Sequence, residues 1–100
     1  MIHRSLLVAL LVSISLQLGC SPAPNTIRID GSSTVYPISA MIAELYGEAN
    51  NKSTRVAVAY SGTGGGMKKF IAGEIDICDA SRRIKDSEVE ACSDAGVEFI

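Results

Sequence analysis

Four short segments after residue 25 are rich in β-branched side chains and place apolar residues at or near every second position. A period of two is typical of strands, because successive side chains of a strand point to opposite faces. Glycine or small polar residues flank the segments and indicate turns. The predicted strands are residues 26–30, 55–60, 75–78 and 97–100.

The stretch between the first two strands has a different period. Apolar side chains recur at three- and four-residue steps from Val35 to Tyr46, which predicts an amphipathic helix. Pro37 suits the first turn of this helix, where a missing N–H group costs nothing. Ser33 or Thr34 would cap its N-terminus.

Two shorter helices are predicted further along. Residues 67–72 form the first, with Gly73 as its stop, and Ser87-x-x-Glu90 has capping-box spacing for the second, which Gly96 closes. Strands and helices therefore alternate, which predicts an α/β fold with a mostly parallel sheet and flanking helices. Because the sequence stops within the fourth predicted strand, we expect the sheet to be incomplete at its C-terminal end.

The first 19 residues resemble a secretory signal peptide, with a basic start and an apolar run over residues 5–18. That run is shorter than the roughly 20 residues a membrane span needs. Leu18-Gly19-Cys20 resembles the lipobox of bacterial lipoproteins, with Cys20 as the lipidated residue, although Gln17 stands where leucine is usual. Cleavage without lipidation, or no processing at all, is the alternative. Residues 20–25 would form a tether, and residues 26–100 the folded part.

Composition and charge exclude several classes of protein. The chain has 100 residues, a net charge of -2 and a pI near 5.2, which argues against a nucleic-acid binder. Its single histidine, His3, lies in the predicted signal peptide, so no histidine base is available to a serine or cysteine nucleophile. Two cysteines without histidine do not complete a zinc site. We therefore expect no enzyme, cofactor or metal, and we interpret Lys68 and Lys69 as surface charges.

Two interpretations of Cys78 and Cys92 stay open. Export would bring both into an oxidising compartment, where a disulfide is permitted. Alternatively, Cys78 is a buried strand residue and Cys92 a helix residue that does not meet it. Sequence gives no distance with which to decide.

Three loops that follow predicted strands are rich in small hydroxyl residues: residues 31–34, 61–66 and 79–82. Ligands of open parallel sheets bind at the carboxyl ends of strands. Helix N-termini offer free N–H groups, glycine lets the backbone approach closely, and hydroxyls donate hydrogen bonds, so the three loops together predict an anion site. A flexible glycine turn is the alternative. Met67-Lys68-Lys69 after Gly66 excludes a P-loop, and a dinucleotide fingerprint also fails.

The motifs DGSSTVYPI, SGTGGGMKKF and DICDASRRI, in this order, resemble the N-terminal lobe of Pst-type phosphate-binding proteins, the extracytoplasmic receptors of phosphate ABC importers. The resemblance covers residues 26–100. It implies two α/β lobes that close on one oxyanion, of which this chain supplies part of the first, in a fold of the type II periplasmic-binding-protein kind. The implied substrate-binding residues are Ser33, Thr34, Thr63, Gly64, Gly65, Ser81 and Arg82.

One of these positions departs from the family pattern. Many relatives have an aspartate where Ser81 stands, and that carboxylate accepts the proton of bound phosphate and so rejects sulfate. A hydroxyl is a weaker acceptor, which leaves discrimination against sulfate open. Asp79 is a possible substitute, and Arg82 either makes a charge-assisted contact or lies on the surface.

We therefore expect a non-catalytic, monomeric receptor that binds phosphate and delivers it to an ABC importer permease. It would be exported to the periplasm or cell surface, and attached to the membrane only through a lipid on Cys20. The alternatives are a sensory or adhesion protein on the same scaffold, a receptor for sulfate or molybdate, and an exported hydrolase that uses the glycine loop as an oxyanion hole.

Overall fold

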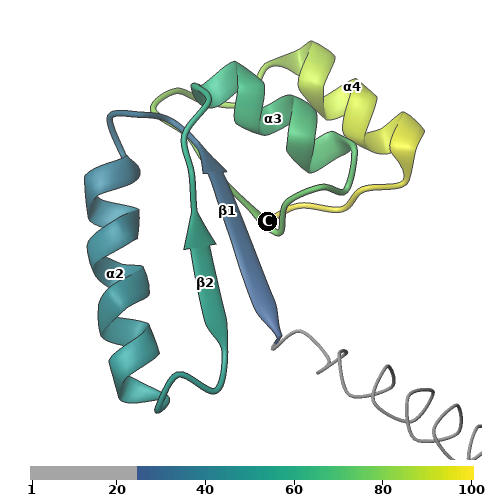
Figure 1. Ribbon diagram of the computed structural model, residues 1–100. Helices are drawn as coiled ribbons and strands as arrows, with labels where there is room; N and C mark the ends of the chain where they lie inside the picture. The colour runs from purple at the N-terminus through teal and green to yellow at the C-terminus, as the bar shows by residue number, and fades with distance from the viewer. Residues whose placement is uncertain (1–24) are drawn as a thin grey trace, which may run out of the picture.

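The computed structural model describes residues 25–100, which form three strands and three helices (Figure 1). The expectations for the signal peptide and for lipidation of Cys20 fall outside the described residues. In chain order, the elements are β1 (Thr26–Gly31), α2 (Tyr36–Ala49), β2 (Arg55–Val58), α3 (Thr63–Ile71), β3 (Ile77–Asp79) and α4 (Asp86–Ala95).

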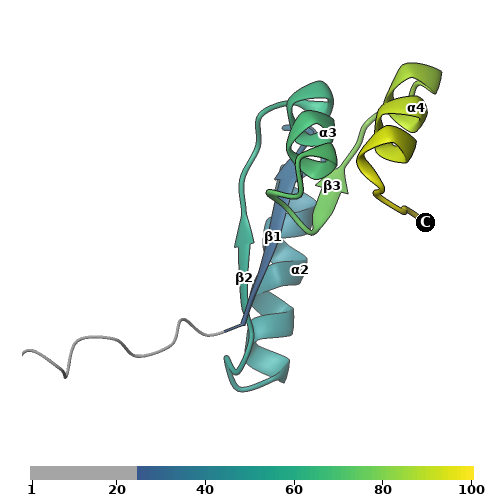
Figure 2. The same cartoon turned by 90° about the vertical axis from the view of Figure 1, so that its right-hand side faces the viewer.

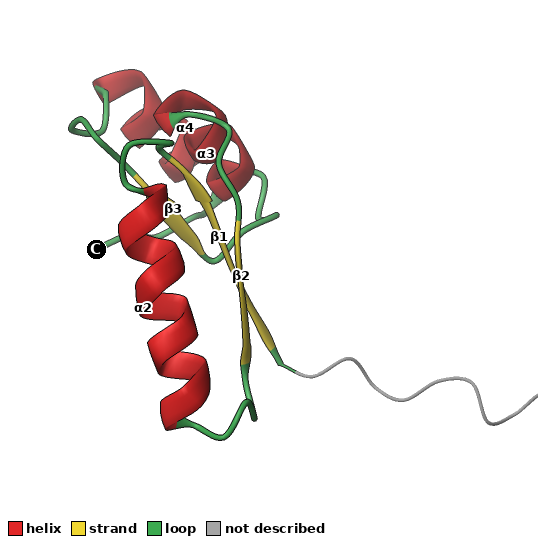
Figure 3. Cartoon of the chain, turned by 60° about the vertical axis from the view of Figure 1, so that its left-hand side comes forward, coloured by secondary structure: helices red, strands yellow, loops and turns green. Residues whose placement is uncertain are grey.

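The three strands form one parallel sheet with the order β2-β1-β3. Ile29 is paired with Val58 on one side of β1, and Gly31 is paired with Asp79 on the other. Helix α2 covers one face of the sheet, whereas α3 covers the other with α4 beside it (Figure 3). The predicted α/β class and parallel sheet are confirmed.

The predicted fourth strand is wrong for the described residues, because 97–100 have no strand conformation. A strand needs a neighbour to complete its backbone hydrogen bonds, and the sheet ends at β3. The segment instead descends from α4 and ends to the side of β3, which Figure 2 shows.

Helix α2 is confirmed, but its apolar stripe does not face the sheet. Ile38, Met41, Ile42 and Leu45 are all more than half exposed. The less exposed positions include small residues one turn apart, such as Ser39 and the alanines at 40 and 43. Small side chains let the helix approach the sheet closely, and this leaves the larger ones outside.

Both predicted N-caps are wrong. Val35 occupies the N-cap position of α2, and no side-chain hydrogen bond caps that helix. In the turn before it, the Thr34 N–H donates to the Ser32 hydroxyl at 3.2 Å. Helix α4 begins at Asp86, one residue before the predicted cap, and the Lys85 N–H donates to the Glu88 carboxylate at 2.9 Å. Pro37 does lie in the first turn of α2, as expected.

Apart from Cys92 in α4, the buried residues lie between the carboxyl end of β1 and the first turns of α3. In these two places the chain buries Asp30, Gly31, Ser32, Gly66 and Met67. A closely packed region therefore lies directly beneath the loops that leave the strands.

Candidate functional site

Backbone hydrogen bonds join the three hydroxyl-rich loops at one edge of the sheet. The Ser61 N–H donates to the Gly31 carbonyl at 3.1 Å, and the Ser32 N–H donates to the Asp79 carbonyl at 2.9 Å. The starts of all three loops are thus tied to the end of β1. Figure 1 shows this edge at the top of the sheet, next to α3.

Two of the predicted hydroxyl residues are in direct contact. The oxygens Thr63 Oγ1 and Ser81 Oγ lie 3.2 Å apart, and the Ser81 N–H donates to Thr63 Oγ1 at 3.2 Å. Ser81 is exposed and Thr63 half-buried. Residues 18 positions apart in sequence therefore present two hydroxyls side by side at the start of α3.

Ser33 and Thr34 lie exposed in the turn between β1 and α2. They follow Ser32 directly, and the Ser32 N–H is bonded to the Asp79 carbonyl. Their backbone is therefore placed at the same edge, although no hydrogen bond joins their side chains to Thr63 or Ser81 among the described contacts.

Helix α3 begins at Thr63 rather than at the predicted Met67, so the three glycines form its first turn. The Gly66 N–H donates to the Gly62 carbonyl at 2.9 Å and starts the helical ladder. The N–H groups of Thr63, Gly64 and Gly65 precede that bond and have no partner in the helix itself. Together with the partial positive charge of a helix N-terminus, they form a place for an anion.

Close packing explains why one of these residues must be glycine. A Cβ on Gly66 would lie 2.6 Å from the Gly31 Cα, 2.9 Å from the Asp30 carbonyl oxygen and 2.9 Å from the Cys78 sulfur. The first turn of α3 thus rests directly on the strand. Gly31 has a φ of 149°, and a Cβ there would lie 2.0 Å from the Asp79 carbonyl oxygen, so it too must be glycine.

The guanidinium of Arg82 is held by a carboxylate. It donates to Glu88 through two nitrogens, at 2.9 and 2.7 Å, in a fork geometry. The hydrogen bonds from Arg82, helped by the Lys85 N–H, lower the pKa of Glu88 to about 2. A Cβ on Gly64 would lie 3.9 Å from Arg82 Nη2, so the guanidinium also lies beside the start of α3.

The Asp79 carboxylate does not lie beside Ser81, where it could replace the aspartate of the family pattern. Its Oδ2 accepts a hydrogen bond from the Ser39 hydroxyl at 2.6 Å, which directs the carboxylate toward α2. The Thr63–Ser81 pair belongs to the end of the sheet next to α3. Sequence alternation did not reveal which face Asp79 occupies, and the contact with Ser39 decides it.

A polar cluster that the sequence did not predict lies beneath the glycine turn. Asp30, only 3% exposed, accepts a hydrogen bond from the Ser61 hydroxyl at 2.7 Å and pairs with Lys69 at 2.5 Å. Burial raises the pKa of Asp30. The hydrogen bonds from Lys69 and Ser61, together with the Lys69 charge, outweigh this effect, so the pKa of Asp30 is below its ordinary value. Lys69 is partly exposed, as expected of a surface charge, but its pairing with the buried Asp30 was not predicted. The sequence signal for this pairing was that Lys69 lies three residues after Gly66 and therefore on the same face of the helix.

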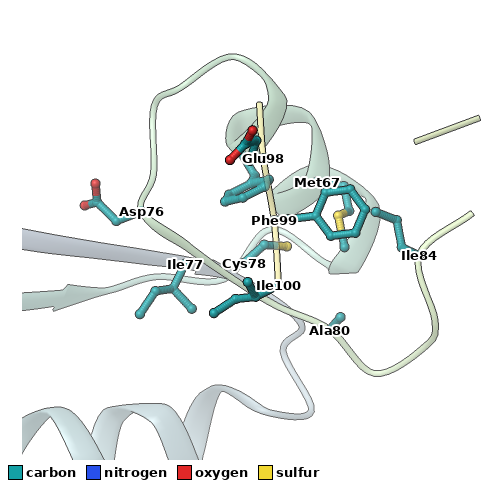
Figure 4. A pocket seen from close by; sticks show the side chains of 10 residues that line it. Met67, Asp76, Ile77, Cys78, Ala80, Ile84, Glu98, Phe99 and Ile100 are labelled. Carbon is teal, nitrogen blue, oxygen red and sulfur yellow. The ribbon is translucent and has the colours of Figure 1, made fainter. Parts of the chain in front are cut away.

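The cysteines are free thiols in the structure, Cys78 half-buried and Cys92 buried. Of the two interpretations, the structure therefore has the one in which Cys78 and Cys92 do not pair. Burial and nearby carboxylates raise the pKa of Cys78. Cys78 also lines a cavity of about 700 Å³ between α3, β3 and the C-terminal segment (Figure 4).

That cavity is largely apolar and separate from the hydroxyl pair. Figure 4 shows Met67, Phe99 and Ile84 on one side of it and Ile77 and Ile100 on another. Neither Thr63 nor Ser81 lines it. Its walls therefore offer little to a small anion.

None of the helices in residues 25–100 has the length and hydropathy of a membrane span. No group of three or more histidine, cysteine, aspartate or glutamate side chains converges there as a metal site would require.

Comparisons with known proteins agree with this architecture. Protein SphX from Synechococcus elongatus is 54% identical over 74 residues, which are 74% of this chain and 22% of that protein. The phosphate-binding protein PstS from Staphylococcus saprophyticus is 44% identical over 73% of this chain and 23% of that protein. The chain thus spans less than a quarter of these relatives' length.

A solved structure, described as a possible phosphate binding protein from Planctomyces limnophilus, has the same fold with a TM-score of 0.73. It is 46% identical, and the match covers 79% of this chain and 28% of that one. The family model of the PBP superfamily domain matches residues 20–100. The chain therefore belongs to the PBP superfamily.

Proposed function

We propose that this chain is part of a non-catalytic receptor that binds phosphate for import by an ABC transporter. The support comes from the edge of the sheet, where hydroxyls and free backbone N–H groups meet. Relatives named as phosphate-binding proteins are similar to it in sequence, and solved structures described as a possible phosphate binding protein and as an ABC-type phosphate transport receptor are similar to it in fold. Oxyanions suit such a site because all of its groups can donate hydrogen bonds.

The contact between Thr63 and Ser81 carries the proposal. It brings two distant loops together at the start of α3, 3.2 Å apart, without a histidine or metal cluster among the described residues. Ser33, Thr34, Gly64 and Gly65 complete the proposed site from neighbouring backbone. Arg82 would add charge at its border, moderated by Glu88.

The proposed site has one charged carboxylate fewer than the family pattern implies, because Ser81 takes the place of an aspartate. We propose that phosphate and sulfate are therefore discriminated less sharply than in relatives that have the aspartate. Export, a lipid on Cys20, delivery to a permease and a monomeric state belong to the same proposal.

Calorimetry on the complete gene product tests this function. Thr63→Val removes the hydroxyl at constant shape and should weaken phosphate binding by about tenfold, the effect of one lost hydrogen bond to an anion. Thr54→Val, at the opposite end of the sheet before β2, is the matched control and should bind phosphate as the parent protein does. No heat with phosphate at neutral pH, beside clear heat with sulfate or molybdate, would refute phosphate as the ligand.

Ser81→Asp tests discrimination. It should lower the affinity for sulfate far more than that for phosphate, because only phosphate has a proton to donate to the new carboxylate. Unchanged affinity for both anions would show that residue 81 does not face the bound anion, and equal losses would refute its role in discrimination.

A further inference from the structure

We infer that Asp30 and Lys69 are positioning residues of the proposed oxyanion site: Asp30 holds the start of the glycine turn, and Lys69 neutralises Asp30 so that a buried carboxylate does not repel the anion. This inference rests on the proposed function. Neither Asp30 nor Lys69 contacts the anion in the proposed site.

The geometry of Asp30 places it directly below the first turn of α3. Its carbonyl oxygen would lie 2.9 Å from a Cβ on Gly66, so strand and helix touch at this residue. Its carboxylate accepts the Ser61 hydroxyl at 2.7 Å, two residues before Thr63. The carboxylate therefore fixes the segment that delivers the Thr63 hydroxyl and the free N–H groups.

A carboxylate in this position has an electrostatic cost. Charges interact strongly where little water separates them, and an anion next to an unpaired Asp30 would be repelled. Lys69 removes the cost, because its ammonium lies 2.5 Å from Asp30 Oδ2. The side chain of Asp30 is 5% exposed and that of Lys69 39%, so the lysine shields the carboxylate from the helix side.

The other charged side chains described at this edge have partners elsewhere, and the cation among them, Arg82, is paired with Glu88 at 2.7 Å. Asp79 follows Cys78, the partner of Asp30 in the sheet, and its carboxylate accepts a hydrogen bond from Ser39 on the opposite face. Lys69 is therefore the cation that compensates Asp30 among the described residues.

Three variants of the complete gene product, titrated with inorganic phosphate, test the inference. Lys69→Met should weaken phosphate binding by about tenfold, because it leaves Asp30 charged and unpaired near the anion. Lys69→Arg keeps the charge and should bind nearly as the parent does. Lys68→Met is the matched control, since it removes the same charge from the exposed neighbouring residue, and should change the affinity by less than about twofold.

The double variant Asp30→Asn with Lys69→Met separates charge compensation from stability. Asparagine still accepts the Ser61 hydroxyl but has no charge, so the double variant should recover most of the parent affinity. Melting of each variant without ligand reports folding separately. If Lys69→Met does not fold, the double variant still must fold and bind phosphate for the inference to stand.

Two results would overturn the inference. Parent-like affinity of folded Lys69→Met would mean that the pair serves stability alone. A double variant as weak as Lys69→Met would mean that Lys69 acts on the anion directly. If the parent protein itself binds no phosphate, the proposed function fails, and this inference fails with it.

Discussion

Substitution of Gly66 by alanine sets two energies against each other. Alanine favours a helix over glycine by about 1 kcal/mol, so the change would be stabilising if the space were free. The added Cβ would instead lie under 3.0 Å from three atoms, two of them backbone atoms of β1. Overpacking of this kind costs about 3 kcal/mol, at the upper end of its usual range, because a strand cannot move aside as a flexible side chain can.

The expected net loss for Gly66→Ala is therefore about 2 kcal/mol in the free energy of unfolding. Gly47→Ala is the matched control, because it makes the same exchange in α2, where a new Cβ meets nothing within 4 Å. The control should gain about 1 kcal/mol. Urea denaturation of the complete gene product, followed by circular dichroism, measures both values.

Phosphate titration extends the same comparison to the site. A displaced α3 carries Thr63 and the free N–H groups away from the loop after β3, so Gly66→Ala should also weaken binding. Equal stabilisation by the two alanines would refute the reasoning, because it would mean that α3 does not rest on β1 at Gly66.

Three further predictions concern polar contacts and a thiol. The pKa of Glu88 is about 2 against an ordinary 4.5, so its ion pair with Arg82 stabilises the fold above about pH 4.5, and this contribution is lost as the pH falls toward 2. Glu88→Gln should flatten the pH dependence of the unfolding midpoint in that range. An unchanged slope would contradict the ion pair. Ser39→Ala should lower the free energy of unfolding by about 1 to 2 kcal/mol in urea denaturation, because the half-buried Asp79 loses a charge-assisted hydrogen bond. An unchanged midpoint would show that water replaces the hydroxyl. Cys92 is fully buried and should react with a thiol reagent only after denaturant is added, whereas labelling of the native protein at the rate of a free thiol would place it at the surface.

Local pattern was sufficient for most of the fold. Alternation along residues 26–30 and the helical period from Val35 identified β1 and α2, because backbone geometry alone dictates those periods. The face of α2 was not predictable in the same way. The apolar stripe at Ile38 and Met41 has the pattern of a core face, but the small residues of α2 allow the closer approach to the sheet.

The candidate site followed from strand order and from the family motifs, yet its polar supports did not. Thr63 and Ser81 were expected at one edge because parallel strands end together. The pairing of Lys69 with Asp30 depends on where α3 begins. That start was not predicted, because glycine has a low helix propensity. Tertiary packing on Gly31 overrides that propensity.

The outer surface of α2 has a practical consequence for handling the protein. Ile38, Met41, Ile42 and Leu45 form a continuous hydrocarbon ridge on one side of the helix, and water around such a ridge is displaced readily by a second one. A form of the protein in which this ridge is exposed should self-associate, with an apparent mass in sedimentation that increases with concentration. Lysine in place of Met41 should keep such a form monodisperse, since a charge in the middle of the ridge opposes the stacking of two copies.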